Sequence, residues 1–190
     1  DLPGYDDAAP LLAVDNLCVT FESFEGEVAA VDGVSFTVNP GETLCIVGES
    51  GSGKSASQMA ILGLLSTPPA IISGSVRFCG IELVHAPQST LFTVRGSGVS
   101  MIFQDAITSL NPSLKVGFQI AEVFCARTGS DRASGRKYAI ELMERVAIPD
   151  ASQRVDDYPF QFSGGMCQRI MIAMALALNP KILIADEPTT

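Results

Sequence analysis

The stretch Gly48-Glu49-Ser50-Gly51-Ser52-Gly53-Lys54-Ser55 matches the pattern G-x-x-x-x-G-K-[ST]. The apolar run Thr43–Val47 before it has the character of a buried strand, and Ala56–Leu65 after it carries apolar residues at helical spacing. A strand, a glycine loop and a helix in this order predict a phosphate-binding loop. The alternative, a glycine-rich turn with a chance Lys-Ser pair, leaves the flanking strand and helix unexplained.

The residue types in this loop suit a nucleoside triphosphate. Its three glycines allow the backbone to curl so that successive N–H groups converge on phosphate oxygens. The following helix adds the positive end of its dipole. We expect Lys54 to place its charge on the β- and γ-phosphates and the Ser55 hydroxyl to ligate Mg²⁺.

Composition limits the remaining possibilities. The 190 residues are 47% hydrophobic and 17% charged, which is typical of a globular protein with one substantial core. The formal net charge of −9 and the lack of a basic stripe argue against a nucleic-acid partner. The longest wholly apolar run, Ile170–Leu178, is nine residues, against about 20 for a membrane span. With no secretory signal at the start, we expect a soluble, intracellular protein.

The five cysteines and the single histidine give no sign of a metal or disulfide framework. No two cysteines form a C-x-x-C pair, so scattered reduced thiols are expected. His85 lies in a loop-like context, and we expect it at the surface without a catalytic role. The chain begins at Asp1 without a Met and stops at Thr190 just after a predicted strand, which suggests a fragment.

Elements on both sides of the loop can be predicted. Leu11–Phe21 and Ala29–Val38 predict a hairpin joined by Glu22–Glu27, and Asn39–Gly41 predicts a turn. Further strands are expected at 73–78 and 99–103. Helical spacing is found in 116–127 and 132–147, with a loop at 149–159 and, after an N-cap at Ser163, a buried helix over 165–178.

A second chemical signal lies at the end of the chain. The continuous apolar run Ile182–Ala185 ends in Asp186 and Glu187, as in a Walker B strand. At the carboxyl edge of a parallel sheet, Asp186 is expected to hold Mg²⁺ and Glu187 to polarise the attacking water. The alternative is a strand that merely ends in solvated acids.

A third signal is Phe162-Ser163-Gly164-Gly165-Met166, which places a hydroxyl and two glycines at the start of a helix. This is a second anion-binding helix N-terminus. Such a cap is a weak signal alone, and its weight comes from the single buried helix that separates it from Asp186.

Taken together, these motifs in this order resemble the ATP-binding subunit of an ABC transporter, from Leu12 to Thr190. Several stretches resemble the oligopeptide, dipeptide and nickel importers, among them 47–55, 101–105 with 108–112, Tyr158-Pro159 and 171–176; Met166 in place of Gln is also typical of that subgroup. The resemblance implies an α/β P-loop NTPase fold with a RecA-like core. It implies one domain over 1–190 with an antiparallel β part at 11–40, a nucleotide-binding core at 41–111 and 160–190, and a helical subdomain at 112–159.

The resemblance also implies roles for individual residues. Phe21, or its rival Phe24, would stack on adenine, and Gln104 would touch Mg²⁺ and the attacking water beside the contact with the membrane subunit. Ser55, Gln104 and Asp186 would be the metal ligands, and Glu187, Gln104 and Lys54 the catalytic residues. The nucleotide would contact Phe21, Gly48, Glu49, Ser50, Gly51, Ser52, Gly53, Lys54, Ser55, Gln104, Ser163, Gly164, Gly165 and Met166.

The family's partners follow in the same way. The cofactors would be ATP and Mg²⁺, and the active unit a head-to-tail dimer with a second ABC ATPase subunit, bound to transmembrane permease subunits at the cytoplasmic face of the membrane. An extracytoplasmic binding protein would act indirectly and choose the substrate together with the permease.

The chain departs from the subgroup at Ala106, where Pro is usual, at Cys167, where Arg is usual, and mildly at Phe162, where Leu is usual. We expect the loss of charge at position 167 to weaken contact with phosphates of the partner's nucleotide. The family's switch histidine lies after Walker B, so we expect the present chain to hydrolyse ATP poorly.

Three other classes remain to be weighed. A soluble ABC ATPase of DNA repair or translation is disfavoured by the net charge of −9. A GTPase or small kinase lacks an Asn-Lys-x-Asp signature here and leaves the Ser-Gly-Gly helix unexplained. A decayed binding module is disfavoured because Lys54, Asp186 and Glu187 are all present.

Overall fold

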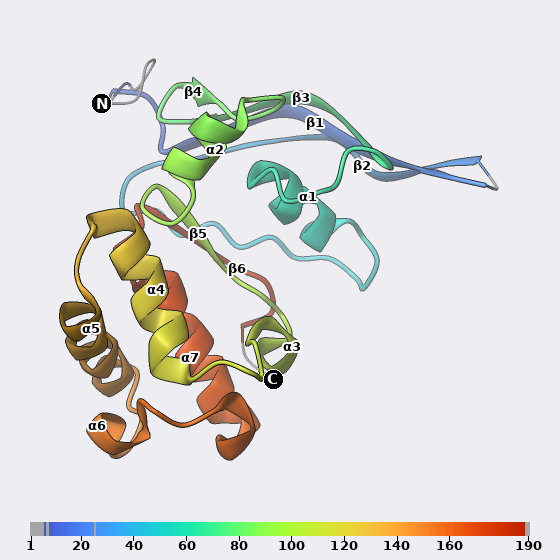
Figure 1. Ribbon diagram of the computed structural model, residues 1–190. Helices are drawn as coiled ribbons and strands as arrows, with labels where there is room; N and C mark the ends of the chain where they lie inside the picture. Colours follow the sequence, from blue (N-terminus) through green and yellow to red (C-terminus); the bar gives the residue numbers. More distant parts are fainter. Residues whose placement is uncertain (1–5, 7, 25, 189–190) are drawn as a thin grey trace. The chain divides into compact units, whose positions relative to one another are not determined.

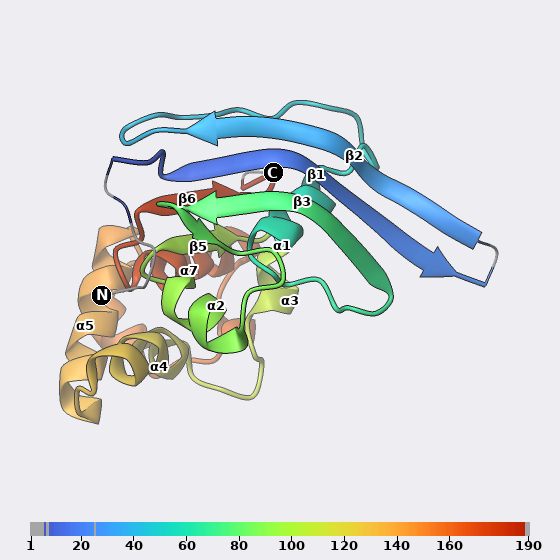
Figure 2. The same ribbon diagram turned by 90° about the horizontal axis from the view of Figure 1, so that it is seen from above.

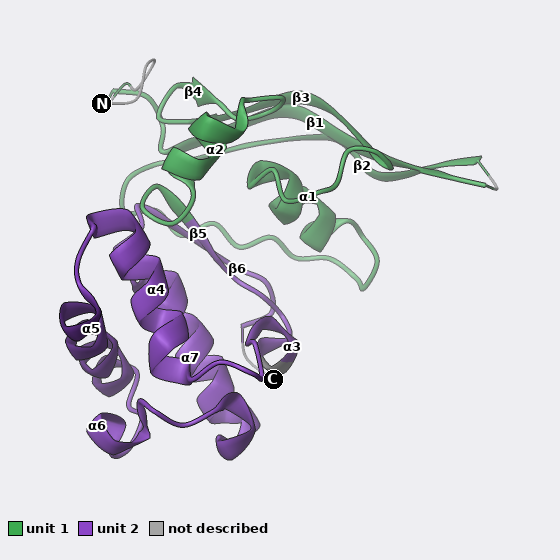
Figure 3. Cartoon of the chain, viewed as in Figure 1, with its two compact units in different colours: residues 1–99 green, residues 100–190 purple. Residues whose placement is uncertain are grey.

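The computed structural model describes residues 6, 8–24 and 26–188, and the chain forms two compact units, 1–99 and 100–190 (Figure 3). Unit 1 contains the glycine loop, and unit 2 contains the residues around Asp186. The three-part division into β part, core and helical subdomain remains a prediction.

Unit 1 is built on an antiparallel sheet of four strands in the order β2-β1-β3-β4 (Figures 1 and 2). The strands are β1 (Leu12–Ser23), β2 (Gly26–Val38), β3 (Ala70–Phe78) and β4 (Ile81–Glu82). β1 pairs with β2 from Leu12 opposite Val38 to Ser23 opposite Gly26. The predicted hairpin is therefore confirmed, but its strands run on through most of the expected connector.

The helix α1 (Lys54–Ile61) packs against β1 and β2, and a second short helix, α2 (Gln88–Val94), was not predicted. Alternate residues of β1 supply the core because successive strand side chains point to opposite faces. The most buried side chains of this unit include Leu17, Val19, Val76, Phe78 and Ile61.

The strand predicted at Thr43–Val47 is wrong for this structure. The segment between the Asn39–Gly41 turn and the glycine loop has no strand, and its apolar side chains are exposed, with Val47 at 88%. A strand exists only through hydrogen bonds to a neighbouring strand, and no described residue provides that ladder here. The segment is apolar, as a buried strand would be, but an apolar pattern does not show whether a neighbouring strand is there to pair with it.

Unit 2 combines a two-stranded sheet with helices (Figure 1). The strands are β5 (Val99–Ile102), whose first residue closes unit 1, and β6 (Ile182–Ala185). The helices are α3 (Ala106–Ser109), α4 (Val116–Thr128), α5 (Arg132–Arg145), α6 (Ala151–Arg154), the 3₁₀ turn η1 (Pro159–Gln161) and α7 (Gly164–Leu176).

The predicted helices at 116–127, 132–147 and 165–178 are confirmed within one to two residues at each end, and the expected strands at 99–103 and 182–185 are present. The segment 149–159, predicted as a loop, contains α6. Buried side chains of α4, α5 and α7, such as Ile120, Met143 and Ile170, form one core. None of the helices in the described ranges has the length and apolarity to cross a membrane.

Candidate functional site

The glycine loop of unit 1 has the conformation that its composition predicts. Ser52 N donates to Glu49 O at 3.2 Å, which closes a turn, and Gly51 and Gly53 have φ values of 81° and 87°. In the part of the chain that the structure describes, the amides of Gly51, Gly53 and Lys54 have no hydrogen-bond acceptor. These free donors at the start of α1 fit a phosphate group.

Gly53 is fixed by its contact with β2. A Cβ built at this position would lie 2.1 Å from Ala30 O, so no other residue fits without moving the backbone. The positive φ disfavours a side chain independently. The loop thus meets the sheet at the residue that begins α1.

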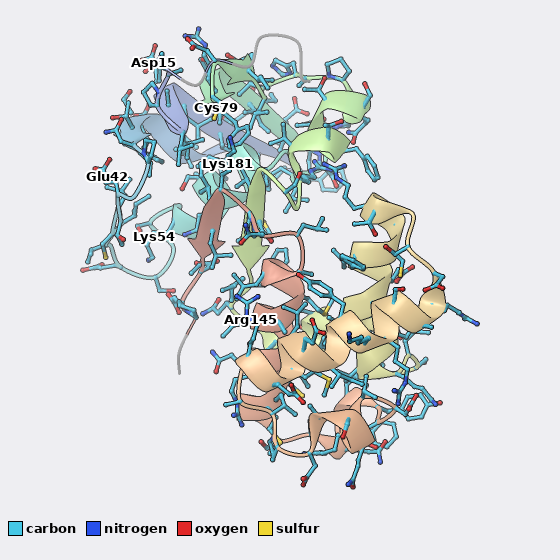
Figure 4. All side chains as sticks on the ribbon, turned by 90° about the vertical axis from the view of Figure 1, so that its left-hand side faces the viewer. Asp15, Glu42, Lys54, Cys79, Arg145 and Lys181 are labelled. Atoms are coloured by element: carbon cyan, nitrogen blue, oxygen red, sulfur yellow. The ribbon has the colours of Figure 1, made fainter. Side chains whose placement is uncertain are left out.

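Lys54 lies over the loop from which it comes; it is labelled in Figure 4. Its Nζ donates to Gly48 O and to Glu49 O, each at 2.8 Å. Both acceptors are neutral carbonyls, and phosphate oxygens are stronger acceptors for an ammonium group. The ammonium group is thus held at the glycine loop by neutral acceptors, and its contact with a phosphate remains a prediction.

The adenine contact is less defined. Phe21 is half-buried in β1 opposite Val28 and Ala70, whereas Phe24 is fully exposed in the hairpin. Stacking on a base suits a partly exposed ring. The choice of Phe21 remains a prediction.

In unit 2, the acidic residues lie at the end of β6 beside β5. Asp186 N donates to Ile102 O at 3.0 Å, which continues the β5–β6 pairing by one residue, and Asp186 is only 7% exposed. The backbone of Asp186 is thus held at the end of the β5–β6 pairing, and the role of its carboxylate remains a prediction.

Gln104 and Glu187 are brought together by this pairing. Gln104 Nε2 donates to Glu187 Oε2 at 2.7 Å, although the two residues are 83 positions apart. Glu187 has φ of 46°, an uncommon conformation for a residue with a side chain. The sequence predicted that both residues serve the attacking water and did not predict this direct contact.

The metal set stays a prediction. The described ranges contain no group of three His, Cys, Asp or Glu side chains that could hold a metal ion alone. Asp186 lies in unit 2 and offers carboxylate oxygens, and Ser55 lies exposed in unit 1 and offers a hydroxyl. Hard oxygen atoms of these kinds are the ligands that Mg²⁺ prefers.

The helix N-terminus at Ser163 is formed as predicted. Ser163 caps α7 by accepting a hydrogen bond from Met166 N at 3.4 Å. Gly164 and Gly165 have no atoms near the positions where Cβ atoms would lie, so the backbone of the first turn is open. The turn can therefore approach an anion closely.

The Cys167 side chain is buried, and the expectation that its lack of charge weakens contact with a partner's phosphates remains a prediction. The thiol is 3% exposed and donates to Pro159 O at 3.5 Å, and burial raises its pKa. The side chain at this position therefore points into the core.

Two residues near these motifs were missed. Gln168 in α7 donates from Nε2 to Pro188 O, just after Glu187. Arg154 contacts the segment before Ser163 from α6. Both act through contacts that depend on tertiary structure, so neither carries a sequence signal of its own.

Comparison with known proteins identifies the family of the chain. The family model described as ABC transporter matches residues 31–190, so the chain belongs to the ABC transporter family. The chain is 50% identical over 181 residues to the oligopeptide transport ATP-binding protein OppD of Bacillus subtilis, covering 95% of this chain and 51% of that protein. It is 48% identical over 180 residues to the dipeptide transport ATP-binding protein DppD of Escherichia coli, covering 95% and 55%. The chain thus spans about half the length of these relatives.

A solved structure confirms the fold. A dimeric post-hydrolysis state of the ATP-binding cassette MJ0796, bound to ADP and Pi, matches with a TM-score of 0.81 and 29% identity over 94% of this chain and 74% of that chain. The fold is therefore that of an ABC cassette, a P-loop NTPase with an antiparallel β part, as the sequence predicted.

Proposed function

We propose that this chain binds and hydrolyses ATP and powers the import of di- or oligopeptides. The hydrogen bond between Gln104 and Glu187, beside the buried Asp186, is the observation that carries the hydrolytic part. The peptide substrate rests on about 50% identity to relatives named for oligopeptide and dipeptide transport.

The residues divide into three groups by task. The loop 48–55, Phe21, Gln104 and the turn 163–166 would bind the nucleotide, and Ser55, Gln104 and Asp186 would hold Mg²⁺. The catalytic residues are Lys54, Gln104 and Glu187. Magnesium supplies neutralisation of phosphate charge, and Lys54 adds to it.

Glu187 and Gln104 prepare the water. The Glu187 carboxylate accepts a proton from the attacking water, and the hydrogen bond from Gln104 fixes the carboxylate in place. Because Gln104 donates with Nε2, its Oε1 is the atom that orients the water or touches the metal. Both side chains are exposed, which gives water access.

The proposed assembly is supported by the dimeric structure of the cassette MJ0796 and by the relatives named for peptide transport. In a head-to-tail dimer, the second ATPase subunit would place its own Ser-Gly-Gly turn against the nucleotide bound at the glycine loop of this chain. The dimer would sit peripherally at the cytoplasmic face of the membrane on permease subunits, and a binding protein outside would deliver the peptide.

The test is ATP-dependent peptide uptake into vesicles that contain the complete assembly. We expect uptake with ATP inside, none with the non-hydrolysable analogue AMP-PNP, and none with Glu187→Gln. ATP hydrolysis that does not respond to peptide or to the binding protein would contradict the transport function and leave the ATPase.

A further inference from the structure

The segment 155–162 decides where α7 begins, because it is the chain that leads into Ser163. Only η1 within it is regular. One side is tied to α4: Val116 N donates to Asp157 O and Gly117 N to Val155 O, both at 2.9 Å. Gly117 allows this approach, since a Cβ there would lie 2.1 Å from a methyl of Val155.

The end of the segment nearest Ser163 is contacted by the Arg154 side chain, with all three guanidinium nitrogens engaged. Its Nε lies 3.2 Å from Asp157 Oδ2, Nη2 donates to Gln161 O at 2.9 Å, and Nη1 contacts Met166 Sδ at 3.4 Å. Asp157 and Gln161 come before Ser163 in the chain, and Met166 comes after it. Elsewhere in the segment, Arg136 and Lys115 pair with Asp156, and the Cys167 thiol donates to Pro159 O.

The ring of Phe162 completes the contact. Arg154 Cζ lies 4.1 Å from the centre of that ring, within the range of a cation–π interaction. The Arg154–Asp157 pair is partly buried, with side chains 22% and 28% exposed. By contrast, the pair of Arg136 with Asp156 is about half exposed, and such surface pairs contribute little.

The planar fork explains why this position needs arginine. One group must meet a carboxylate, a carbonyl, a sulfur and a ring face at once, and a lysine ammonium cannot present donors in one plane. Loss of the fork would leave the 155–162 segment held by its backbone bonds to α4, by the exposed pairs of Asp156 and by the Cys167–Pro159 hydrogen bond, none of which involves Gln161 or Phe162. The start of α7 would then vary in position.

We infer that Arg154 is a positioning residue that places the Ser163-Gly164-Gly165 turn for contact with the phosphates of a nucleotide. The inference rests on the proposed function. The contacts of Arg154 reach this turn through Phe162, Gln161 and Met166. Small misplacements of such groups cost about tenfold to a hundredfold in rate.

The experiment uses the full-length subunit. It compares the variants Arg154→Ala, Arg154→Lys and Asp157→Asn with the control variant Arg136→Ala. Three quantities are measured: the ATP Kd of the single subunit, kcat for ATP hydrolysis in the assembled transporter, and the melting temperature. For Arg154→Ala we expect kcat to fall about tenfold or more, with the ATP Kd within about twofold, because the glycine loop of unit 1 is untouched.

We expect Arg154→Lys to recover part of kcat, because it keeps the charge beside Asp157 and loses the fork. Asp157→Asn should lower kcat less than Arg154→Ala, and Arg136→Ala should match the wild type. If Arg154→Ala does not fold, Arg154→Lys and Asp157→Asn test the inference instead. For these variants too, kcat should fall while the ATP Kd stays close to that of the wild type.

Three results would overturn the inference: kcat of Arg154→Ala equal to that of Arg136→Ala, a Kd that weakens in proportion to kcat, or a lowered melting temperature with kcat per folded subunit unchanged. A wild-type subunit that neither binds nor hydrolyses ATP would instead contradict the proposed function. The two failures are thus distinguishable.

Discussion

The two halves of the candidate site are held in place in different ways. In unit 1 the backbone determines the shape of the glycine loop. Glycines at positive φ and the close approach of Gly53 to Ala30 fix the loop conformation, and Lys54 donates to carbonyls of the same loop. In unit 2 side chains far apart in sequence meet, as Gln104 and Glu187 do. A locally determined loop and a site that depends on tertiary contacts should respond differently to substitution.

The largest expected effect is on hydrolysis through the second half. Glu187→Gln removes the carboxylate that accepts the proton and keeps the size of the side chain, so ATP hydrolysis should fall by about 10²- to 10⁴-fold. ATP binding should remain, since the glycine loop is unaffected. Steady-state ATP turnover and the ATP Kd, measured in the complete assembly, check this prediction. If turnover and ATP affinity fell in parallel, Glu187 would be a binding residue and not the proton acceptor.

The next effect concerns the backbone of the first half. Gly53→Ala introduces a Cβ 2.1 Å from Ala30 O at a φ of 87°, so we expect a loss of about 2 kcal/mol in unfolding free energy and about tenfold in ATP affinity. The matched control is Gly41→Ala, which has a φ of 75° and open space. It should cost about 1 kcal/mol and leave affinity unchanged. Equal effects of both variants would show that the approach to Ala30 is unimportant.

The two apolar runs that precede the two halves should also differ. Ile182 in β6 is 9% exposed, whereas Ile46 is 41% exposed and belongs to no strand. Ile182→Asn should lower the unfolding free energy of this chain by about 2–4 kcal/mol, and Ile46→Asn by less than about 1 kcal/mol. Urea unfolding of both variants measures the difference. Similar losses would mean that 43–47 is buried in solution.

A smaller effect, dependent on pH, is expected in the sheet of unit 1. Burial opposes ionisation of Glu82, but hydrogen bonds from Ser75 Oγ at 2.5 Å and from the amides of Val76 and Val84, together with the Arg77 charge, lower its pKa below the usual 4.5. A lowered pKa stabilises the folded chain above the unfolded value, and this contribution is lost as the pH falls through the folded value.

Glu82→Gln should therefore lower the unfolding free energy near neutral pH by about 1 kcal/mol, a figure reduced for solvent exposure. The gap between wild type and variant should narrow as the pH falls below the unfolded pKa value and close as it falls through the lowered folded pKa value. Thermal melts at pH 7 and pH 3.5 measure it. A gap that is constant across this range would assign the effect to packing.

These differences explain what the sequence could predict. The loop 48–55, the Ser163 cap and the helices at 116–127 and 132–147 follow from local chemistry, namely glycine freedom, capping and helical periodicity. The Gln104–Glu187 contact, the Arg154 anchor and the burial of Cys167 depend on which segments meet, and no local pattern encodes that. The failed strand at Thr43–Val47 shows the same limit, because an apolar run becomes a strand only where a partner pairs with it.

The most direct test of the central claim is a titration of this chain with Mg-ATP, with Lys54→Ala as the control and circular dichroism to verify that both are folded. We expect saturable binding by the wild type and a loss of about a hundredfold or more in Lys54→Ala, because the ammonium group lies where the loop receives a phosphate. Equal affinity of the two folded chains, or no binding by a folded wild type, would contradict the assignment of the glycine loop as the nucleotide site.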